Sequence, residues 1–369
     1  MRILFDYEIF CLQKYGGVSR YFYELISRLL NFPESEIILY MGKFINQYGL
    51  EKFQLQYYNF FGKKVKYLPK TKLFFVKFQQ YLFEKFRSKI DYNVFHQTYF
   101  RPYRPHQNEI RIITVHDFTH EKYPEYFSFF DHTVENKKRA INTAHGIICV
   151  SNSTKDDLLK IYPDVKGEIK VIYHGNSLNI QVKNEPYFKY PYFLFVGSRK
   201  GYKNFNLLLN AFTLLPELKK NYKIVCFGGG DFTTKEINLI KKLSLEQNFV
   251  QIEGNDIILA NAYNFATALI YPSLYEGFGI PLVEAMNYGC PLLISNTSCL
   301  PEIAQDAALY FDPLSPEDLA DKMKLIISDS TLRGVLKIKA AQRGRYFSWE
   351  KCAEETFGFY KMIAEKFNK

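Results

Sequence analysis

With 369 residues, of which 47% are hydrophobic and 23% charged, the chain has the composition of a soluble globular protein and enough length for two domains of ordinary size. This balance excludes a mainly disordered chain, and no apolar run approaches the ~18 residues that a membrane-spanning helix requires. The six cysteines have no metal-ligating or paired spacing, which argues against a zinc site and a secreted disulfide scaffold. Because residues 1–10 do not resemble a signal peptide, we expect a cytoplasmic location.

The first half of the chain alternates short apolar runs with helical patterns, which is typical of a parallel sheet flanked by helices. Six strands are predicted there: Arg2–Asp6, Glu36–Tyr40, Asn93–Gln97, Ile110–Val115, Gly146–Val150 and Glu168–Tyr173. The following segment, Gly175–Pro191, has no clear periodicity and is predicted to be a linker. We therefore expect a first domain at residues 1–180.

Residues 61–90 concentrate the positive charge of the chain, whose net charge is +10. This basic segment has nine Lys or Arg residues, one acidic residue, Glu84, and eight interleaved aromatic residues. We favour contact with an anionic membrane surface. The contacting residues would be Lys63, Lys64, Lys66, Lys70 and Lys72. A solvated helix face with a core stripe and a nucleic-acid-binding segment are the alternatives, although no nucleic-acid-binding motif occurs.

The second half repeats the alternation of strands and helices. Its predicted strands are Tyr192–Val196, Lys223–Phe227, Phe249–Ile252, Ala268–Tyr271, Pro291–Ser295 and Ala308–Phe311. Helical patterns such as Asn206–Phe212 and Asp318–Ile327 separate them. The expected architecture is α/β with two consecutive doubly wound units, the second at residues 187–345. The final amphipathic stretch, residues 349–369, is long enough to pack back on the first domain.

In open α/β sheets, ligands bind beyond the carboxyl ends of the strands, so motifs directly after predicted strands are candidate sites. Gly16 and Gly17 follow the first strand and would let the backbone approach a phosphate, although a plain turn is the alternative. His116 follows Ile110–Val115 and can hydrogen-bond a sugar hydroxyl or transfer a proton. A core or capping histidine is the alternative, and a metal site with His120 lacks a third ligand.

The loop Gly197–Asn204 follows a predicted strand and precedes a helical pattern. Its cations Arg199, Lys200 and Lys203 could hold a diphosphate, because their charge adds to that of the helix dipole. A solvated basic turn is the alternative.

The most informative string runs from Glu276 to Glu284, directly after a predicted strand. Pro281 is typical of a first helical turn, so a short helix is predicted from Pro281 to Tyr288. Glu276 then lies in the loop and Glu284 one turn inside the helix. The two carboxylates would face one pocket from different depths and could bind two sets of hydroxyl groups.

The same region resembles the retaining glycosyltransferases of the GT-B fold in glycosyltransferase family 4, which contain an E-x7-E element. The similar strings begin at Tyr271 (Tyr-Pro-Ser-Leu-Tyr-Glu-Gly-Phe-Gly-Ile-Pro-Leu-Val-Glu-Ala-Met), Gly289 (Gly-Cys-Pro), Ser298 (Ser-Cys-Leu-Pro-Glu-Ile) and Ala308 (Ala-Leu-Tyr-Phe-Asp-Pro). The Gly-Gly-Val loop and the pairs His-Asp, Val-Ser and Lys-Asn occur in the expected order. The resemblance therefore covers nearly the whole chain.

The resemblance implies two Rossmann-like domains that face each other across a cleft, and it implies a role for each matching residue. Glu284 would hold the ribose hydroxyls of a nucleotide sugar. Glu276 would be catalytic and lie beside the transferred sugar, near the amides of Phe278, Gly279 and Ile280.

Other matching residues would act on the phosphates and the sugar. Lys203 would neutralise the leaving diphosphate, and His116, the second catalytic residue, would contact the sugar from the first domain. The glycine pair after the first strand would lie against the phosphates or the acceptor. Many members place Arg directly after the glycine of the Lys203 loop; here Ser198 stands there, and Arg199 is the candidate replacement.

The implied activity is transfer of a hexose, with mannose as the first guess, from a nucleoside diphosphate sugar to a glycan or polyprenyl-linked acceptor. Retention of the anomeric configuration and a role in surface polysaccharide or lipopolysaccharide synthesis are expected. Because the chain has no Asp-x-Asp triplet, we expect no metal ion, and we expect no cofactor besides the co-substrate. We also expect peripheral association with the inner face of the cytoplasmic membrane and no nucleic-acid partner. A GT-B-like epimerase and a non-enzymatic binding module that uses residues 61–90 are the alternatives.

Overall fold

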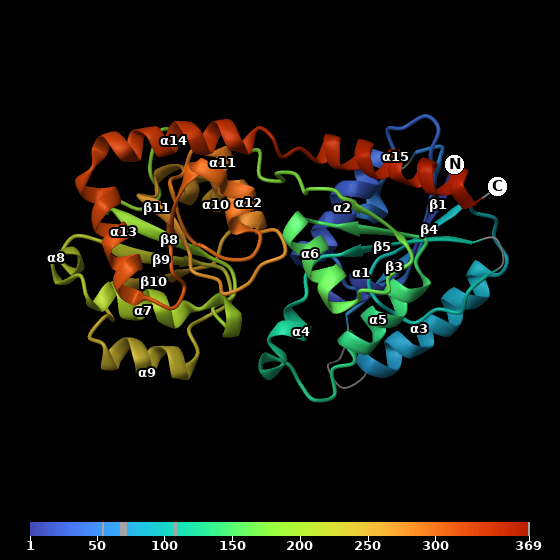
Figure 1. Ribbon diagram of the computed structural model, residues 1–369, viewed down its shortest axis with the longest axis horizontal. Helices are drawn as coiled ribbons and strands as arrows, with labels where there is room; N and C mark the ends of the chain where they lie inside the picture. Colours follow the sequence, from blue (N-terminus) through green and yellow to red (C-terminus); the bar gives the residue numbers. More distant parts are fainter. Residues whose placement is uncertain (54, 67–71, 107–108, 368–369) are drawn as a thin grey trace. The chain divides into compact units, whose positions relative to one another are not determined.

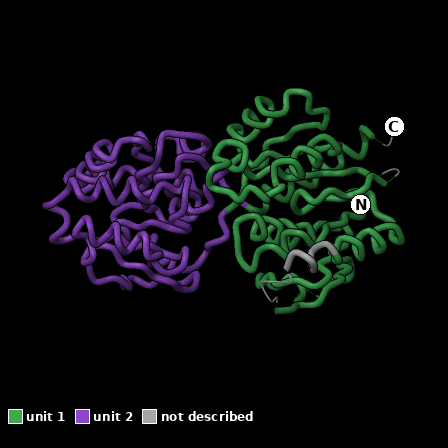
Figure 2. The backbone as a smooth tube through the Cα atoms, turned by 90° about the horizontal axis from the view of Figure 1, so that it is seen from below, with its two compact units in different colours: residues 1–175, 349–369 green, residues 176–348 purple. Residues whose placement is uncertain are grey.

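The computed structural model describes residues 1–53, 55–66, 72–106 and 109–367. The chain divides into two compact units, which are coloured separately in Figure 2. Unit 1 comprises residues 1–175 and 349–369, and unit 2 comprises residues 176–348. The expected boundaries at residues 180, 187 and 345 are therefore corrected. Leu178 is buried and its carbonyl accepts hydrogen bonds from Asn287 and Tyr288, so the start of the expected linker is part of unit 2.

Unit 1 is built on a parallel sheet of seven strands within the described part of the chain, in the order β3-β2-β1-β4-β5-β6-β7. The strands are β1 Arg2–Phe5, β2 Glu36–Phe44, β3 Tyr58–Lys64, β4 Val94–Gln97, β5 Ile110–Val115, β6 Gly146–Cys149 and β7 Glu168–Val171. The central strands are buried on both faces, which explains their nearly continuous apolar sequences. The strand order reverses between β1 and β4, and such reversals are where open sheets bind ligands.

Helices surround this sheet, and the last helix of the chain is one of them (Figure 1). The α-helices are α1 Glu8–Leu12, α2 Gly17–Leu29, α3 Lys72–Arg87, α4 Thr119–Lys122, α5 Thr133–Thr143, α6 Asn152–Ile161 and α15 Trp349–Phe367, with short 3-10 helices η1 Leu50–Lys52 and η3 Pro124–Tyr126. The helix α15 packs on α2, and Trp349 at its start is fully buried. The apolar side of the final amphipathic stretch is thus buried within unit 1.

Unit 2 contains a second parallel sheet, of six strands in the order β10-β9-β8-β11-β12-β13. The strands are β8 Tyr192–Val196, β9 Lys223–Phe227, β10 Phe249–Ile252, β11 Ala268–Tyr271, β12 Leu292–Ser295 and β13 Ala308–Phe311. The α-helices are α7 Phe205–Thr213, α8 Pro216–Lys219, α9 Thr234–Lys242, α10 Asp256–Phe265, α11 Ile280–Asn287, α12 Leu300–Ala304, α13 Pro316–Ser328 and α14 Ser330–Gly344, with 3-10 helices η4 Gly201–Lys203 and η5 Gln305–Ala307. Two Rossmann-like units therefore follow one another, as the GT-B resemblance implies.

All twelve predicted strands are present, most of them within a residue or two of the predicted bounds. The prediction missed β3, whose Phe-Phe-Gly-Lys-Lys sequence lacks apolar alternation. This edge strand is held by backbone pairing with β2 and is mostly exposed. The basic segment is therefore divided between the end of β3 and the helix α3.

Candidate active site

The string Glu276–Glu284 lies at the carboxyl end of β11 and the start of α11. Gly279 precedes the helix with a φ of +85°, a left-handed conformation that favours glycine. Pro281 lies in the first turn, where its missing N–H leaves no helical hydrogen bond unmade. The helix begins and ends one residue earlier than predicted. Its amino-terminal amides and positive dipole end are therefore next to the loop that contains Glu276.

Glu276 forms an ion pair with Lys203. The Lys203 Nζ lies 2.6 Å from Glu276 Oε1, and the side chains are 21% and 10% exposed, respectively. The Tyr271 hydroxyl lies 3.4 Å from the same Nζ. Burial raises the pKa of Tyr271 well above its usual value, and the charge of Glu276 adds to this effect, so the hydroxyl stays protonated. An ammonium group has three donors, so Lys203 can keep Glu276 and still donate to a ligand oxygen.

A neighbouring asparagine places Lys203 against this loop. Asn204 adopts a left-handed conformation, with a φ of +56°, and its side-chain amide donates to the backbone carbonyls of Pro272 and Pro313. The backbone N–H of Leu274 also donates to the carbonyl of Tyr202. The loop after β8 and the loop after β11 are thus joined on both sides of Lys203.

Glu284 lies inside α11 and is 7% exposed. Its Oε2 accepts a hydrogen bond of 3.0 Å from the hydroxyl of Tyr263 in α10. Phe278, which precedes the helix, is buried and packs edge-on against Phe347 at a centroid distance of 5.7 Å. Glu276 and Glu284 therefore lie in one continuous loop and helix, each with its own partner.

Arg199 is already engaged by protein groups. Its Nε lies 3.0 Å from Glu236 Oε1, and its other two nitrogens donate to the carbonyls of Gly228, Gly230 and Asp231. The side chain is 2% exposed. The expected role of Arg199 in binding a diphosphate is therefore without support here, because every nitrogen of its guanidinium donates inside unit 2.

The loop that Arg199 holds, Gly228–Gly230, was not among the predicted site residues. All three glycines have φ between +73° and +76°. A Cβ on Gly229 would lie 2.4 Å from the carbonyl oxygen of Gly197, so the two loops approach as closely as glycine allows. Three consecutive glycines directly after a predicted strand are the pattern that could have identified this loop.

In unit 1, the glycine pair lies at the amino terminus of α2. Gly16 precedes the helix and Gly17 is its first residue. The backbone N–H of Gly16 lies 3.3 Å from the Tyr48 hydroxyl, and the Gln13 side chain accepts from the N–H of Ser19. The structure therefore places both glycines at a helix start, as the phosphate interpretation requires, and beside polar side chains from the same unit.

His116 follows β5 and lies among aromatic rings. Its ring meets Tyr21 edge-on at a centroid distance of 5.1 Å and lies 5.7 Å from the ring of His174. Its Nε2 is buried and has no hydrogen-bond partner among the described residues. Burial lowers the pKa of His116 to about 4, with Lys137 contributing and Asp117 opposing. The imidazole is therefore neutral at pH 7.

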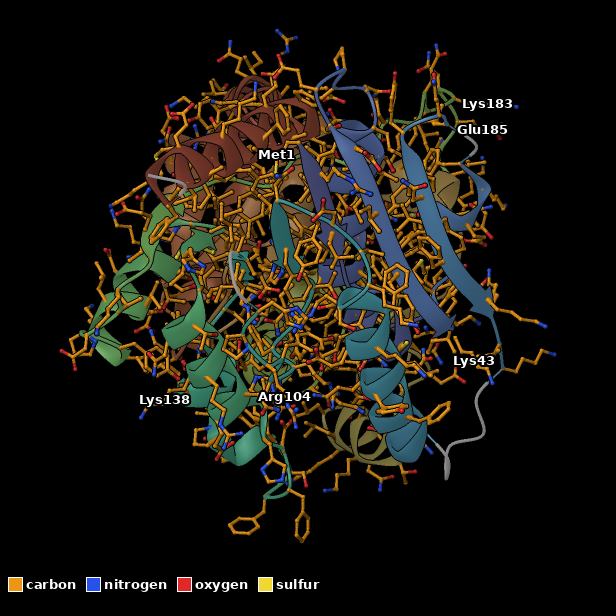
Figure 3. All side chains as sticks on the ribbon, turned by 90° about the vertical axis from the view of Figure 1, so that its right-hand side faces the viewer. Met1, Lys43, Arg104, Lys138, Lys183 and Glu185 are labelled. Carbon is orange, nitrogen blue, oxygen red and sulfur yellow. The ribbon has the colours of Figure 1, made fainter. Side chains whose placement is uncertain are left out.

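The lysines expected at a membrane lie in different places. Lys63, Lys64 and Lys66 are exposed, Lys70 lies outside the described residues, and Lys72 is the first residue of α3. Lys63 pairs in register with Lys43 of β2, so two exposed like charges lie side by side on neighbouring strands. Figure 3 labels Lys43 at the opposite end of the sheet from Met1.

Part of the basic segment is structural. Arg87 is 1% exposed and forms ion pairs with Glu84 and Glu109. Its guanidinium also lies over the rings of Phe95 and Tyr103. Among the side chains that the structure describes, the most exposed aromatic ones lie elsewhere in unit 1, in the loop between η3 and α5. They are Phe129 and Phe130, which are 95% and 82% exposed.

Within the described residues, no group of three or more His, Cys, Asp and Glu side chains is arranged to hold a metal ion. No helix in the same part of the chain has the length and apolar character needed to cross a membrane.

Comparisons with known proteins follow the division into two units. The family described as Glycosyltransferase Family 4 matches residues 15–179, and the family described as Glycosyl transferases group 1 matches residues 176–343. A curated relative, O-antigen chain mannosyltransferase B of Escherichia coli, is 26% identical, with 94% of this chain and 96% of the relative covered.

Solved structures share the fold. Sucrose-phosphate synthase from Thermosynechococcus elongatus has a TM-score of 0.77 at 18% identity, with 98% of each chain covered. Anabaena HepE in complex with UDP and glucose has a TM-score of 0.72 at 16% identity, with 98% of this chain and 99% of HepE covered. Since the two family matches together span residues 15–343, the chain belongs to glycosyltransferase family 4 and is a glycosyltransferase with the GT-B fold.

Proposed function

We propose that this enzyme transfers a hexose from a nucleoside diphosphate sugar to a glycan or polyprenyl-linked acceptor, with retention of the anomeric configuration and without a metal ion. The observation that carries the proposal is the Lys203–Glu276 ion pair beside the amino terminus of α11, with Glu284 one turn further on. This arrangement combines a cation and helix amides for a diphosphate with carboxylates for hydroxyl groups.

The proposed chemistry follows from where charge develops. Breaking the glycosyl–phosphate bond leaves negative charge on the diphosphate and positive charge on the sugar. Lys203 and the amino terminus of α11 stabilise the first, and the Glu276 carboxylate stabilises the second. Attack by the acceptor on the face that the diphosphate leaves would retain configuration. His116, neutral at pH 7, is proposed to hydrogen-bond the transferred sugar.

We propose mannose as the sugar and lipopolysaccharide or another surface polysaccharide as the product. Support comes from the relative in Escherichia coli, whose name describes a mannosyltransferase of the O-antigen chain. HepE, a structural neighbour in complex with UDP and glucose, supports a nucleoside diphosphate at this fold. The experiments below identify the base of the nucleotide and test for an acceptor.

The first experiment measures thermal stabilisation by GDP-, UDP-, ADP- and dTDP-sugars in EDTA, on the wild type and Glu284→Ala. A ligand at a hundred times its dissociation constant adds about 2.7 kcal/mol to the free energy of unfolding. We expect one nucleotide class to stabilise the wild type only. Stabilisation that requires a divalent ion, or that persists in Glu284→Ala, would contradict the proposed site.

Product analysis then separates the transferase from an epimerase. With the stabilising donor, we expect nucleoside diphosphate release to depend on an acceptor, and NMR of the product to show the donor's anomeric configuration. An inverted sugar released without any acceptor would indicate the epimerase instead.

We further propose that unit 1 contacts an anionic membrane on its cytoplasmic side. Besides the lysines of β3, an open surface hollow of about 740 Å³ next to α3 is lined by Tyr81, Lys85 and Arg104, among others. All three side chains are exposed, and Figure 3 labels Arg104. Exposed basic and aromatic side chains together are typical of surfaces that bind anionic headgroups.

Sedimentation with liposomes tests this contact. We expect binding to vesicles containing phosphatidylglycerol, and its loss when Lys63, Lys64 and Lys66 are changed to Gln. The matched control changes three exposed lysines of α9 in unit 2, Lys235, Lys241 and Lys242, to Gln. Equal loss in both variants would indicate non-specific charge attraction, and unchanged binding in the first would exclude these lysines.

A further inference from the structure

The hydrogen bond between Tyr263 and Glu284 points to a residue that no motif contains. The Tyr263 side chain is fully buried, Glu284 is 7% exposed, and the hydroxyl donates to Oε2 over 3.0 Å. We propose that Tyr263 is a positioning residue, which orients the Glu284 carboxylate toward the two ribose hydroxyls of the nucleotide. It would thereby set the preference for ribonucleotides over deoxyribonucleotides. This inference rests on the proposed nucleotide-sugar site.

A glutamate carboxylate needs such a partner to be selective. The terminal torsion of a glutamate is broad and has no sharp staggered minima. A ribose offers two neighbouring hydroxyl groups, and binding both requires a carboxylate rotated so that its two oxygens face the two hydroxyls at once. The hydrogen bond from Tyr263 to Oε2 restricts that rotation. Burial raises the pKa of Tyr263 well above its usual value, and Glu284 adds to this, so the hydroxyl is a permanent donor.

Tyr263 is itself held on its other side. Its ring stacks on Tyr288 with an interplanar angle of 6° and a centroid distance of 6.3 Å. The Tyr288 hydroxyl accepts from the N–H of Ile180 and lies 3.1 Å from the carbonyls of Leu178 and Ile180. The segment that enters unit 2, the end of α11 and the last turn of α10 are therefore linked, and Tyr263 has little freedom to move from Glu284.

The expected effect is on discrimination. Hydrogen bonds to a charged group contribute about 1.5–3 kcal/mol, which corresponds to a 10- to 150-fold preference, in order of magnitude, of the wild type for a ribonucleotide. In Tyr263→Phe the carboxylate loses the restraint of this hydrogen bond, and we expect the preference to fall to about 3-fold or less. The transition state and the ground state use the same ribose contact, so KM should rise more than kcat falls.

Tyr192 provides a matched control. It is 1% exposed, and its hydroxyl donates over 2.8 Å to the carbonyl of Ala262, the residue before Tyr263. Tyr192→Phe therefore removes a buried tyrosine hydroxyl that bonds to the same helix but does not donate to Glu284. A purely structural role of Tyr263 predicts that both variants lose stability and that neither loses discrimination.

Calorimetry would measure the affinities of GDP and UDP, each beside its 2′-deoxy and 3′-deoxy analogues, for the wild type, Tyr263→Phe, Tyr192→Phe and Glu284→Gln. The ratio of two affinities in one preparation is independent of the folded fraction, so a destabilised variant still gives a result. We expect Tyr192→Phe to keep the wild-type ratio, and Tyr263→Phe and Glu284→Gln to lose it. If only Glu284→Gln loses it, the role of Tyr263 is overturned and the ribose site stands. If the wild type shows no preference, the proposed ribose site falls as well.

Discussion

In unit 2 the cation Lys203 meets Glu276 in an ion pair whose side chains are 21% and 10% exposed, whereas in unit 1 Arg87 and Glu109 pair with side chains 0% and 3% exposed. Both cations belong to segments that the sequence marks as basic. The partly exposed pair lies where a parallel sheet binds ligands, and the fully buried pair joins α3 to the start of β5. Burial therefore separates a cation that can serve a ligand from one that serves the fold.

The same contrast applies within unit 2. Arg199 and Lys203 come from one loop, yet all the side-chain nitrogens of Arg199 donate to protein acceptors. Lys203 forms one ion pair, and its side chain is partly exposed. Basic residues of one loop after a strand are therefore not equivalent.

The largest effect is expected for Arg87→Ala. The change removes one of the two arginines that pair with Glu109 and leaves a cavity beside the rings of Phe95 and Tyr103, which together cost about 3–5 kcal/mol in the free energy of unfolding. Urea unfolding measures the loss, and stabilisation of unit 2 by the nucleotide should persist. Lys85→Ala, at an exposed position of the same helix, should change stability by less than about 0.5 kcal/mol. Equal effects of the two variants would refute the structural role of Arg87.

The next largest effect separates Arg199 from Lys203. Arg199→Met should lower the free energy of unfolding by about 2–3 kcal/mol, because it leaves Glu236 and the glycine-loop carbonyls without their donor. Lys203→Met should cost about 1 kcal/mol or less in stability. The transferase rate of Lys203→Met should fall by about 100-fold or more, since this variant lacks the positive charge that stabilises the leaving diphosphate. The reverse pattern would make Arg199 the diphosphate ligand.

A smaller difference in stability is expected between the alanine variants of two glycines in one loop. Gly228 and Gly229 have φ of +73° and +76°, so either change to Ala costs about 1–2 kcal/mol of left-handed strain. A Cβ on Gly229 also meets the Gly197 carbonyl at 2.4 Å, whereas nothing lies within 4 Å of one on Gly228. Thermal unfolding should therefore give Gly229→Ala a lower melting temperature than Gly228→Ala. Equal melting temperatures would show that the loops of Gly197 and Gly229 separate readily.

The smallest effect concerns two buried histidines of unit 1 near neutral pH. Burial lowers the pKa of His96 to about 3 and that of His116 to about 4. The unfolded imidazoles bind protons first, so the free energy of unfolding is highest above about pH 7.5 and decreases as the pH falls toward 4. By pH 6.5 the loss is about 0.4 kcal/mol for each histidine.

NMR can follow the protonation of these two histidines separately from that of other groups, whose titration changes the stability in the opposite direction. Burial raises the pKa of Glu8 to about 7, so its titration stabilises the fold as the pH falls and would mask the histidines in unfolding data. The ring proton shifts of His96 and His116 should stay constant from pH 8 to 5.5. A midpoint near 6.5 for either ring would show that it is not buried in solution.

Much of the fold followed from sequence because parallel strands between helices are apolar on both faces and bounded by turns. The strands β5, β8, β9, β10, β11 and β13 have the predicted bounds. The edge strand β3 was missed because its exposed residues lack the apolar pattern and backbone pairing with β2 holds it in the sheet. Lys203, Glu276 and Glu284 were predicted as site residues because a glycine, a proline and charges at strand ends form a local pattern, and the structure brings Lys203 and Glu276 into contact.

Local sequence patterns were enough to predict the two Rossmann-like units, a short helix that starts within one residue of Pro281 and the residues of the E-x7-E string, since each depends on neighbours within a few turns of chain. Which groups those residues contact depends instead on how distant segments of the chain pack together. The Tyr263 hydroxyl reaches Glu284 because α10 and α11 pack together, and Arg199 is engaged because the loop after β9 folds over it. Such partners lie about 20 to 70 residues apart in the chain, and a hydrogen bond of 3 Å leaves no local trace in the sequence.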